Sequence, residues 1–470
     1  MKARQYGKVT PRVIEDLAAI VGPGHVLTDA DSLALYSRDE TEDLSFPPEV
    51  VVRPAATSEV SRIMKLACRG RIPVTPRGAG TGLSGGALPV CGGISLSLER
   101  MNRILEIDTG NLMAVVEPGV VTEVLQTEVE KLGLYYPPDP ASRGSCMMGG
   151  NVAENAGGPH AVKYGVTKDW VAGLEAVLPD GGVFKTGGKL RKDVSGYNLT
   201  QILVGSEGTL AIVTKIIVKL IPMPAHRRAM VACFDSVEEA ARAVVAVFDK
   251  KVIPAAVEYM EEAAWRTGAE RIGKQLLPTG HAAYLLLESD GAHESVVEQE
   301  AMLMGEACLE MGAADVVVAE TPARIKDLWS VRRAIGEAVK KIAPYKEEDT
   351  VVPRRQVPEL AAAVDQIIRR HGLRAICYGH AGDGNIHVNI LKDEGGQAWS
   401  ANLETAIREI FAKVAALGGK ISGEHGIGWV QRRYLPLTHD AVEIDVMRRI
   451  KMAFDPDGIL NPGKIFPEPE

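Results

Sequence analysis

The stretch Pro76-Arg-Gly-Ala-Gly-Thr-Gly-Leu-Ser-Gly-Gly86 decides how the chain folds, because it begins as a familiar motif and then departs from it. Gly80, Gly82 and Gly85 have the G-x-G-x-x-G spacing of dinucleotide-binding folds, in which a helix must start there and direct its N-terminus at a pyrophosphate. Residues 89–98 instead contain a proline and two glycines, and then alternate apolar and polar side chains as a strand does. The stretch therefore predicts an extended loop between strands.

This loop can still bind a phosphate group. It is not a P-loop, because no Gly-Lys-Ser/Thr ends it. Its small side chains leave successive backbone N–H groups accessible, and such groups form a concave site for anions. Arg77 can add a charge-assisted hydrogen bond. From this segment alone, a plain glycine-rich connection is the alternative.

Two more glycine-rich segments follow in the same half of the chain. Residues 138–158 repeat the small and polar composition, and residues 204–213 place a glycine turn before an apolar strand. Backbone without bulky side chains allows a flat ring to approach closely. Turns alone explain any one of these segments, but three in one half-chain favour backbone that packs against a ligand.

Length and charge limit the kinds of partner. The 470 residues are enough for two domains, and a formal net charge of -8 provides no field that attracts nucleic acid or an anionic membrane. Six cysteines without a C-x-x-C pair encode neither an iron–sulfur cluster nor a zinc finger and are typical of a reducing compartment. We find no signal peptide and no transmembrane segment. We expect a cytoplasmic protein that could reach a membrane through a partner, and a homodimer is compatible with the sequence.

Apolar periodicity predicts an α+β chain. Strands at 50–53 and 72–75 with a helix between them indicate a β-α-β unit, and residues 113–132 predict a second one. Prolines 222 and 224 favour a boundary, which gives domains 1–223 and 224–440 and a tail, 441–470, that returns to the first domain. In the second domain we expect strands near 229–234, 255–259, 282–288, 314–318, 374–379 and 385–390, and helices near 236–249, 293–311, 322–342 and 357–371.

Histidines gather in two glycine-rich segments, residues 378–389 and 422–428. If the residues after the glycine turn in the first segment form a strand, His387 and Asn389 share one face, and the turn can bring His380 alongside. A lone histidine is more often a hydrogen-bonded core residue, but a cluster between glycines is not typical of core packing.

His380, His387 and Glu424 predict a metal site. Two imidazoles and a carboxylate leave coordination positions open, as in catalytic sites, and zinc, ferrous iron or manganese would fit. A 2-hydroxy acid can chelate such a metal through its hydroxyl and one carboxylate oxygen, which lowers the pKa of the hydroxyl. His425, next to Glu424, would then act as the base.

Taken together, the motifs resemble one known family. PRGAGTGLSGG, GGNVAENAGG, VGSEGTLAIVT, GHAGDGNIH, SGEHGIG and DPDGILNPGK are similar to segments of the FAD-linked D-2-hydroxyacid dehydrogenases. This family includes D-lactate dehydrogenase, the FAD subunit of glycolate oxidase and D-2-hydroxyglutarate dehydrogenase. The resemblance spans about residues 40–466 and implies a vanillyl-alcohol-oxidase (PCMH-type) FAD-binding domain followed by an α+β substrate domain with an antiparallel sheet.

The resemblance also implies that the glycine-rich segments bind FAD. Relatives with covalent flavin often carry a histidine in the first loop, and this loop has none, so we expect non-covalent FAD. The residues implied to contact FAD are Pro76, Arg77, Gly78, Ala79, Gly80, Thr81, Leu83, Ser84, Pro138, Ser142, Gly149, Asn151, Asn155, Gly165, Ile212 and Asn461.

The family's substrate residues can be placed on this chain. The resemblance assigns Arg332, in the L-W-x-x-R motif, to the substrate carboxylate and places Asn389 near the substrate. Where 2-hydroxyglutarate-type relatives hold a second carboxylate with a threonine and a lysine, this chain has Gly336 and Glu347. Lys346 is adjacent and stays a candidate for substrate binding. The departure favours a small monoacid, D-lactate ahead of glycolate.

The resemblance implies oxidation of the hydroxy acid to the 2-oxo acid, with proton loss to His425 and hydride transfer to flavin N5. It implies His380, His387 and Glu424 as metal ligands. The electrons would pass to an electron-transfer flavoprotein, an iron–sulfur subunit or a cytochrome, since no cluster or haem site is encoded. A glycolate oxidase subunit and a D-2-hydroxyglutarate dehydrogenase are alternatives. Two alternatives belong to other functional classes: a redox-silent or non-redox protein on the same fold, and a bare nucleotide-binding module.

Overall fold

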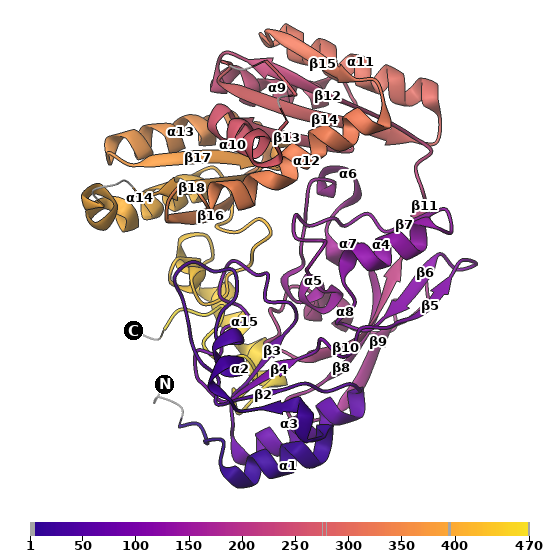
Figure 1. Cartoon of the computed structure of the whole chain (residues 1–470), viewed down its shortest axis with the longest axis vertical. Helices are drawn as coiled ribbons and strands as arrows, with labels where there is room; N and C mark the ends of the chain where they lie inside the picture. Colours follow the sequence, from indigo (N-terminus) through magenta and orange to yellow (C-terminus); the bar gives the residue numbers. More distant parts are fainter. Residues whose placement is uncertain (1–4, 275, 279, 393–395, 469–470) are drawn as a thin grey trace. The chain divides into compact units, whose positions relative to one another are not determined.

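The computed structural model describes residues 5–274, 276–278, 280–392 and 396–468. Its contacts divide the chain into two units (Figure 1): unit 1 comprises Met1–Gly157, Val166–Met223 and Glu424–Glu470, and unit 2 comprises Gly158–Gly165 and Pro224–Gly423. The division after Met223 coincides with the boundary that the prolines indicate. The chain re-enters unit 1 at Glu424 rather than at 441, and the short segment 158–165 belongs to unit 2.

A four-stranded sheet in unit 1 has the order β1-β2-β4-β3, with bounds Val26–Leu27, Val50–Val52, Ile94–Ser97 and Val74–Arg77. β2 and β3 both run parallel to β4, which lies between them. The helix α3 (Thr57–Gly70) connects β2 to β3, and its buried Val60, Ile63 and Met64 form one apolar face. The first β-α-β unit is therefore confirmed.

The second β-α-β unit is wrong. β6 (Met113–Val116) lies in an antiparallel sheet of order β5-β6-β10-β8-β9, whose other strands are Ile104–Asp108, Ile212–Lys219, Val171–Val177 and Val183–Gly187. The short strand after α4 (Thr122–Glu130) is β7 (Leu134–Tyr135), which pairs with β11 (Ile221–Pro222) outside that sheet. A single apolar strand carries no signal for parallel or antiparallel pairing, which explains the error.

The glycine-rich stretch forms no helix, as predicted. β3 ends at Arg77, and the chain runs through turns and bends until β4 begins at Ile94. Gly80 has φ +75°, and a Cβ there would lie 2.2 Å from Nη2 of Arg77. Glycine is favoured at that position, because another residue would be strained at this φ and its Cβ would displace the guanidinium.

Unit 2 contains a seven-stranded sheet in which every neighbouring pair is antiparallel, in the order β15-β12-β14-β13-β17-β18-β16. The bounds in this order are Asp315–Ala319, His226–Phe234, Ala283–Gly291, Ala256–Glu261, Arg374–Gly379, Asn385–Leu391 and Tyr345–Val351. The expected antiparallel α+β domain is confirmed. Sequence analysis missed β16, because Tyr-Lys-Glu-Glu-Asp-Thr-Val has no apolar alternation.

Helices cover both faces of this sheet (Figure 1). α10 (Glu262–Ile272) and α12 (Pro322–Val339) pack together over one face, while α9 (Val237–Asp249), α11 (Glu294–Glu310) and α13 (Val357–Arg370) lie over the other. The core under α12 includes Met260 of β13 and Leu286 of β14. Sequence analysis did not identify α10 or α14 (Gln397–Ala416).

The segment 158–165 is held in unit 2 by two acidic residues of β14. Nζ of Lys163 donates to Oδ1 of the buried Asp290 at 2.6 Å, and the hydroxyl of Tyr164 donates to Oδ2 at 2.8 Å. Nε2 of His160 lies 3.3 Å from Oε1 of Glu288. These contacts explain why the segment leaves the unit that precedes and follows it.

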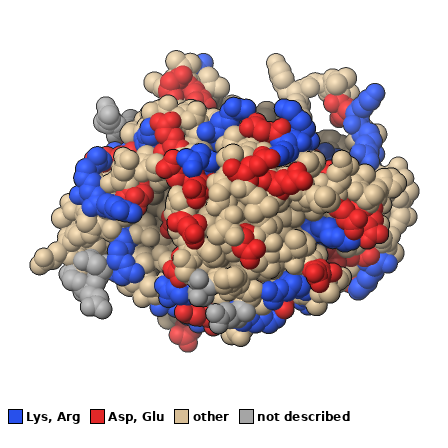
Figure 2. Space-filling view, turned by 90° about the horizontal axis from the view of Figure 1, so that it is seen from above, with Lys and Arg blue, Asp and Glu red and all other residues tan. Residues whose placement is uncertain are grey.

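The remaining helices are α1 (Pro11–Val21), α2 (Ala30–Leu35), α5 (Met148–Glu154), α6 (Ala161–Tyr164), α7 (Thr167–Trp170), α8 (Leu199–Leu203) and α15 (Ala441–Phe454), with 3-10 turns at Pro23–His25, Arg354–Gln356, Ala381–Asp383, Gln431–Arg433 and Leu435–Leu437. Among the described residues, no helix is both long and apolar enough to cross a bilayer. On the face shown in Figure 2, acidic and basic side chains are interspersed without a continuous basic field.

Unit 1 buries two carboxyl groups side by side. A Cβ on Gly426 would lie 2.2 Å from Oε2 of Glu154 and 3.1 Å from Oε1 of Glu207, so both groups press on one glycine. Glu207 accepts hydrogen bonds from the amides of Ile427 and Gly428 at 2.8 and 2.7 Å. The buried Oε2 of Glu154 has no hydrogen-bond partner among the described residues. Burial, and then the charge of Glu207, raise the pKa of Glu154 well above its usual value, so Glu154 holds the proton of the pair.

This proton makes stability depend on pH. A carboxyl whose pKa is higher in the folded than in the unfolded chain binds more protons when folded, so it lowers stability as pH rises above the unfolded pKa of about 4.5. We expect Glu154→Gln to raise the melting temperature at pH 7.5 and to raise it less at pH 5. Thermal unfolding of the flavin-loaded protein across this range measures the effect.

Glu130→Gln, at an exposed glutamate in α4, is the control and should change the melting temperature little at either pH. If Glu154→Gln raised the melting temperature equally at pH 5 and pH 7.5, or lowered it at both, Glu154 would not be the residue that holds the proton.

Candidate active site

The loop after β3 presents unused backbone donors. In the part of the chain that the structure describes, none of the amides of residues 79–84 donates a hydrogen bond, although the carbonyls of Gly80 and Gly82 accept from the amide of Glu40. Arg77 is buried and its Nη1 has no partner among the described residues, and the same is true of the Ser84 hydroxyl. Such a row of donors beside a guanidinium fits the diphosphate of a dinucleotide.

The other glycine-rich segments pack against this loop. A Cβ on Gly78 would lie 3.6 Å from Cβ of Met147, and one on Gly208 would lie 2.8 Å from Cγ of Pro76. The tail closes the same region, because Nδ2 of Asn461 donates to the carbonyls of Gly86 and Glu207 at 3.0 and 2.8 Å. Segments distant in sequence thus meet at one place within unit 1, as the prediction of a shared ligand requires.

The individual FAD candidates differ in what they contact. Asn151, in α5, donates to the Thr122 hydroxyl at 2.6 Å, and the Pro138 carbonyl accepts from Gln126 at 2.9 Å. Asn461 is buried and already bonded to two carbonyls, so it fixes the loop that carries the donors. The places of the other candidates outside the loop are as follows: Ser142 lies in the turn before α5, Gly149 within α5, Asn155 at its C-cap, Ile212 at the start of β10, and Gly165 in the segment assigned to unit 2.

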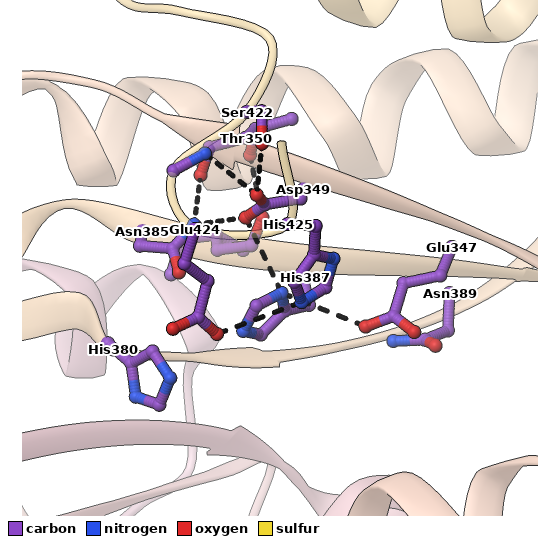
Figure 3. A network of polar contacts seen from close by, with 12 residues as sticks. Glu347, Asp349, Thr350, His380, Asn385, His387, Asn389, Ser422, Glu424 and His425 are labelled. Carbon is purple, nitrogen blue, oxygen red and sulfur yellow. Dashed lines mark hydrogen bonds and ion pairs between the residues drawn. The ribbon is translucent and has the colours of Figure 1, made fainter. Parts of the chain in front are cut away.

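A polar face on neighbouring strands of unit 2 forms the second part of the site. In β18, His387 pairs with Tyr378 of β17 and with Asp349 of β16. Asn389 pairs with Glu347 of β16. Residues paired in register, or two apart on one strand, lie on the same face. Figure 3 shows the side chains of Glu347, Asp349, His387 and Asn389 close together. The predicted common face of His387 and Asn389 is confirmed.

Asp349 anchors the segment that leads to Glu424 and His425. Its Oδ2 accepts hydrogen bonds from the hydroxyl of Ser422 at 2.8 Å and the amide of Gly423 at 2.7 Å, and its Oδ1 accepts from Asn385 at 2.6 Å. Glu424 follows Gly423 directly, so the carboxylate of Asp349 fixes the backbone from which both functional side chains start (Figure 3).

Two donor sets in the described residues are suited to a metal ion. The ligand atoms of His380, His387 and Glu424 all lie within 4.8 Å of one another, which is the predicted combination. Glu347, His387 and His425 form a second such set within the same distance. Nitrogen and carboxylate donors with open positions fit zinc, ferrous iron or manganese. Nδ1 of His380 lies 2.8 Å from Oε1 of Glu258, which leaves its Nε2 on the other side of the ring.

Arg332 comes from α12, and its side chain is almost completely buried. Its Nε lies 2.7 Å from Oε2 of Glu258, in an ion pair rather than a linear hydrogen bond, and its guanidinium carbon lies 5.1 Å from the centre of the Tyr378 ring. A buried guanidinium that is held on one edge can grip a carboxylate with its other nitrogens. The role of Arg332 as a carboxylate clamp stays a prediction.

The register of β16 separates Lys346 from Glu347. Glu347 pairs with Asn389, whereas Lys346 pairs with Ile390 and therefore lies on the opposite face. The carboxylate of Glu347 lies 3.7 Å from Nδ1 of His387. Glu347 rather than Lys346 shares the polar face, and substrate binding by Lys346 stays an untested prediction.

Sequence analysis missed three buried acids, two of which, Glu258 and Asp349, contact residues of the site. Glu258 contacts His380 and Arg332, Asp349 holds Gly423, and Glu288 accepts from Nε1 of Trp329 at 2.6 Å. For Glu258 a signal was present, because one acid lay in the middle of an otherwise apolar strand. A charge that is buried needs a partner, so such an acid indicates a functional or structural pairing.

The arrangement can perform a definite set of chemical tasks. Arg332 can bind a carboxylate, the two imidazoles with Glu424 can bind a cation, and His425 can exchange a proton. The Oδ1 atom of Asn389 is buried without a partner among the described residues, so it can accept a hydrogen bond from a ligand.

Comparison with known proteins places these features in one family. A model of FAD binding domains matches residues 48–187, and a model of the C-terminal domains of FAD linked oxidases matches residues 223–465. The chain is 40% identical to the glycolate oxidase subunit GlcD of Bacillus subtilis, with 97% of each chain covered. It is 38% identical to D-lactate dehydrogenase of Anaerostipes hadrus, over 99% of each. It is 36% identical to D-2-hydroxyglutarate dehydrogenase of Stutzerimonas stutzeri, over 97% of this chain and 99% of that one.

Solved structures show the same fold at lower identity. p-Cresol methylhydroxylase with bound substrate has a TM-score of 0.80 at 19% identity, covering 98% of both chains. Alkyldihydroxyacetonephosphate synthase has a TM-score of 0.75 at 18% identity, covering 98% of this chain and 86% of that one. The fold is thus of the PCMH and vanillyl-alcohol-oxidase type. The chain belongs to the FAD-linked oxidases and is an oxidoreductase of the D-lactate, glycolate and D-2-hydroxyglutarate dehydrogenase type.

Proposed function

We propose that the protein is an FAD- and divalent-metal-dependent dehydrogenase that oxidises a small D-2-hydroxy acid, D-lactate first, to the 2-oxo acid. The observation that carries this proposal lies in unit 2, where the buried guanidinium of Arg332 and the imidazole of His380 contact the same carboxylate, that of Glu258. A cation for a carboxylate and a ligand set for a metal are thus held together. A 2-hydroxy acid presents the matching groups, a carboxylate and an adjacent hydroxyl.

The chain's own residues would bind and deprotonate the substrate. Arg332 would bind the carboxylate, and Asn389, on the same face of β18 as His387, would contact the acid. His425 would take the hydroxyl proton, with the carboxylate of Glu424, 3.7 Å from its Nε2, stabilising the imidazolium.

The cofactors would supply the remaining chemistry. Residues 76–86 and the segments around them would hold FAD non-covalently, and FAD would supply the acceptor, N5, for the hydride from Cα of the substrate. His380, His387 and Glu424 would hold a divalent metal, which would supply a lowered pKa of the substrate hydroxyl. The oxidation is balanced, because the hydroxy acid loses one proton to His425 and one hydride to the flavin.

The substrate preference is inferred from Gly336 and Glu347. Gly336 has no side chain, so this position offers no hydroxyl or charge to a substrate. A Cβ there would lie 3.6 Å from the Tyr378 hydroxyl. The Glu347 carboxylate stands on the face that carries Asn389 and would repel a second carboxylate. Both favour a monoacid over D-2-hydroxyglutarate, with glycolate as the alternative monoacid.

The electrons would leave to a separate protein, an electron-transfer flavoprotein, an iron–sulfur subunit or a cytochrome. Six cysteines without cluster spacing support this part of the proposal. Reduction of an artificial dye by the purified protein tests the oxidation without that partner. A flavin-loaded, metal-replete protein that is inert to D-lactate, glycolate and D-2-hydroxyglutarate would rule out the proposed function.

His425→Asn tests the base. We expect kcat to fall by about 10²- to 10⁴-fold, the usual contribution of a positioned general base, while the visible flavin spectrum is unchanged. Steady-state dye reduction and an absorption spectrum measure the two effects. His293→Asn, at an exposed histidine before α11, is the matched control and should retain full activity. Full turnover by the His425 variant would remove this residue from the mechanism.

Glu347→Gln tests the substrate preference. Removing the charge relieves the repulsion of a second carboxylate, so we expect kcat/KM for D-2-hydroxyglutarate relative to D-lactate to rise by roughly tenfold, a change of about 1.4 kcal/mol. Steady-state kinetics with both acids give this ratio. Lys346→Gln alters the opposite face of β16 and should leave the ratio unchanged. A rise in KM for the Lys346 variant would instead identify that lysine as a substrate residue.

A further inference from the structure

One carboxylate interrupts an apolar face in unit 2. Ala256 and Met260 of β13 belong to the core under α12, and Glu258 lies between them at the same period of two. Glu258 exposes 0% of its surface. A carboxylate removed from water in this way costs several kcal/mol unless charges and hydrogen bonds replace the water. The groups that contact the Glu258 carboxylate therefore indicate the role of this residue.

Glu258 contacts both halves of the proposed substrate site. Nδ1 of His380 lies 2.8 Å from Oε1 and 2.9 Å from Oε2, and Nε of Arg332 lies 2.7 Å from Oε2. His380 follows the end of β17 and Arg332 lies in the middle of α12. One buried side chain thus joins a strand end and a helix that approach it from different directions.

We propose that Glu258 is a positioning residue that orients the metal ligand His380 and the carboxylate clamp Arg332 together, an inference that rests on the function proposed above. An ionised carboxylate only accepts hydrogen bonds, so Nδ1 of His380 carries the proton and its Nε2 keeps the lone pair for a metal. The ion pair at Nε of Arg332 fixes one edge of the guanidinium and leaves the terminal nitrogens for a carboxylate. The centre of the Tyr378 ring lies 5.1 Å from the guanidinium carbon, within the range of a cation–π contact.

The adjacent strand offers a matched control. Glu288 of β14 is also fully buried and lies on the same side of the sheet. Its partners are Nε1 of Trp329 at 2.6 Å and Nε2 of His160 at 3.3 Å. Neither partner is a proposed metal ligand or substrate residue. Loss of either carboxylate leaves buried donors unpaired, but only loss of Glu258 would disorder the site.

The experiment compares Glu258→Gln with Glu288→Gln in the flavin-loaded protein after removal of metal by a chelator. Titration with Zn²⁺ in competition with a chromophoric chelator measures metal affinity without turnover. We expect Zn²⁺ to bind Glu258→Gln about 10- to 100-fold more weakly than the wild type, the usual effect of losing a partner behind a metal-bound histidine. Glu288→Gln should bind Zn²⁺ as the wild type does. At saturating metal, KM for D-lactate should rise in Glu258→Gln and not in Glu288→Gln.

The outcomes separate this inference from the proposed function. Equal loss of Zn²⁺ affinity in the two variants, or none in either, would overturn the role of Glu258 while leaving the proposed dehydrogenase intact. A wild type that binds no Zn²⁺ would overturn the metal site and the inference with it.

A measurement on the wild type covers the case in which Glu258→Gln does not fold. In protein labelled with [¹⁵N]histidine, the His380 signals, assigned by their loss in His380→Gln, should show Nδ1 protonated and only Nε2 shifted by Zn²⁺. A shift of Nδ1 on addition of Zn²⁺ would mean that Glu258 does not hold this nitrogen and would overturn the proposal.

Discussion

The pairing of β18 with β16 and β17 fixes the face on which each polar side chain of the unit 2 site stands. His387 lies opposite Asp349 on one side and Tyr378 on the other. Side chains alternate with a period of two, so a slip of one residue would turn His387 and Asn389 to the opposite face of the sheet. The ladders on both sides of β18 oppose such a slip, and the turn at Gly384 (φ +89°), where a Cβ would lie 1.9 Å from the carbonyl of Val352, admits no other residue.

Buried acids connect this sheet to the rest of the site, and each is neutralised in a different way. Asp349 accepts backbone and side-chain hydrogen bonds from the Ser422–Gly423 segment, whereas Glu258 is paired with a guanidinium and an imidazole. Replacing such groups by apolar side chains of the same volume often preserves or improves stability. Their presence here therefore argues for selection on geometry, because each one determines the orientation of a group that would touch substrate or metal.

The sequence contained enough to predict the loop and most strands, but not all of the site. Pro89 and the glycines after Gly86 excluded a helix, and the antiparallel second domain followed from the family resemblance. The partners of Glu258 lie far away in sequence, at 332 and 380, and no local pattern connects them. β16 was missed for a related reason. Its two faces are both polar, so the alternation that identifies a strand, and that would have distinguished Lys346 from Glu347, is absent.

The path of the chain has a consequence for how this protein can be made. The polypeptide passes from one unit to the other after residues 157, 165, 223 and 423, and Val74 of β3 exchanges backbone hydrogen bonds with Ile459 and Asn461. During synthesis on the ribosome, Val74 therefore cannot form these two hydrogen bonds until residue 461 has emerged. A fragment that starts near residue 224 would lack Lys163 and Tyr164 and would leave the carboxylate of Asp290 buried without them. Neither contiguous half of the chain therefore contains a complete unit.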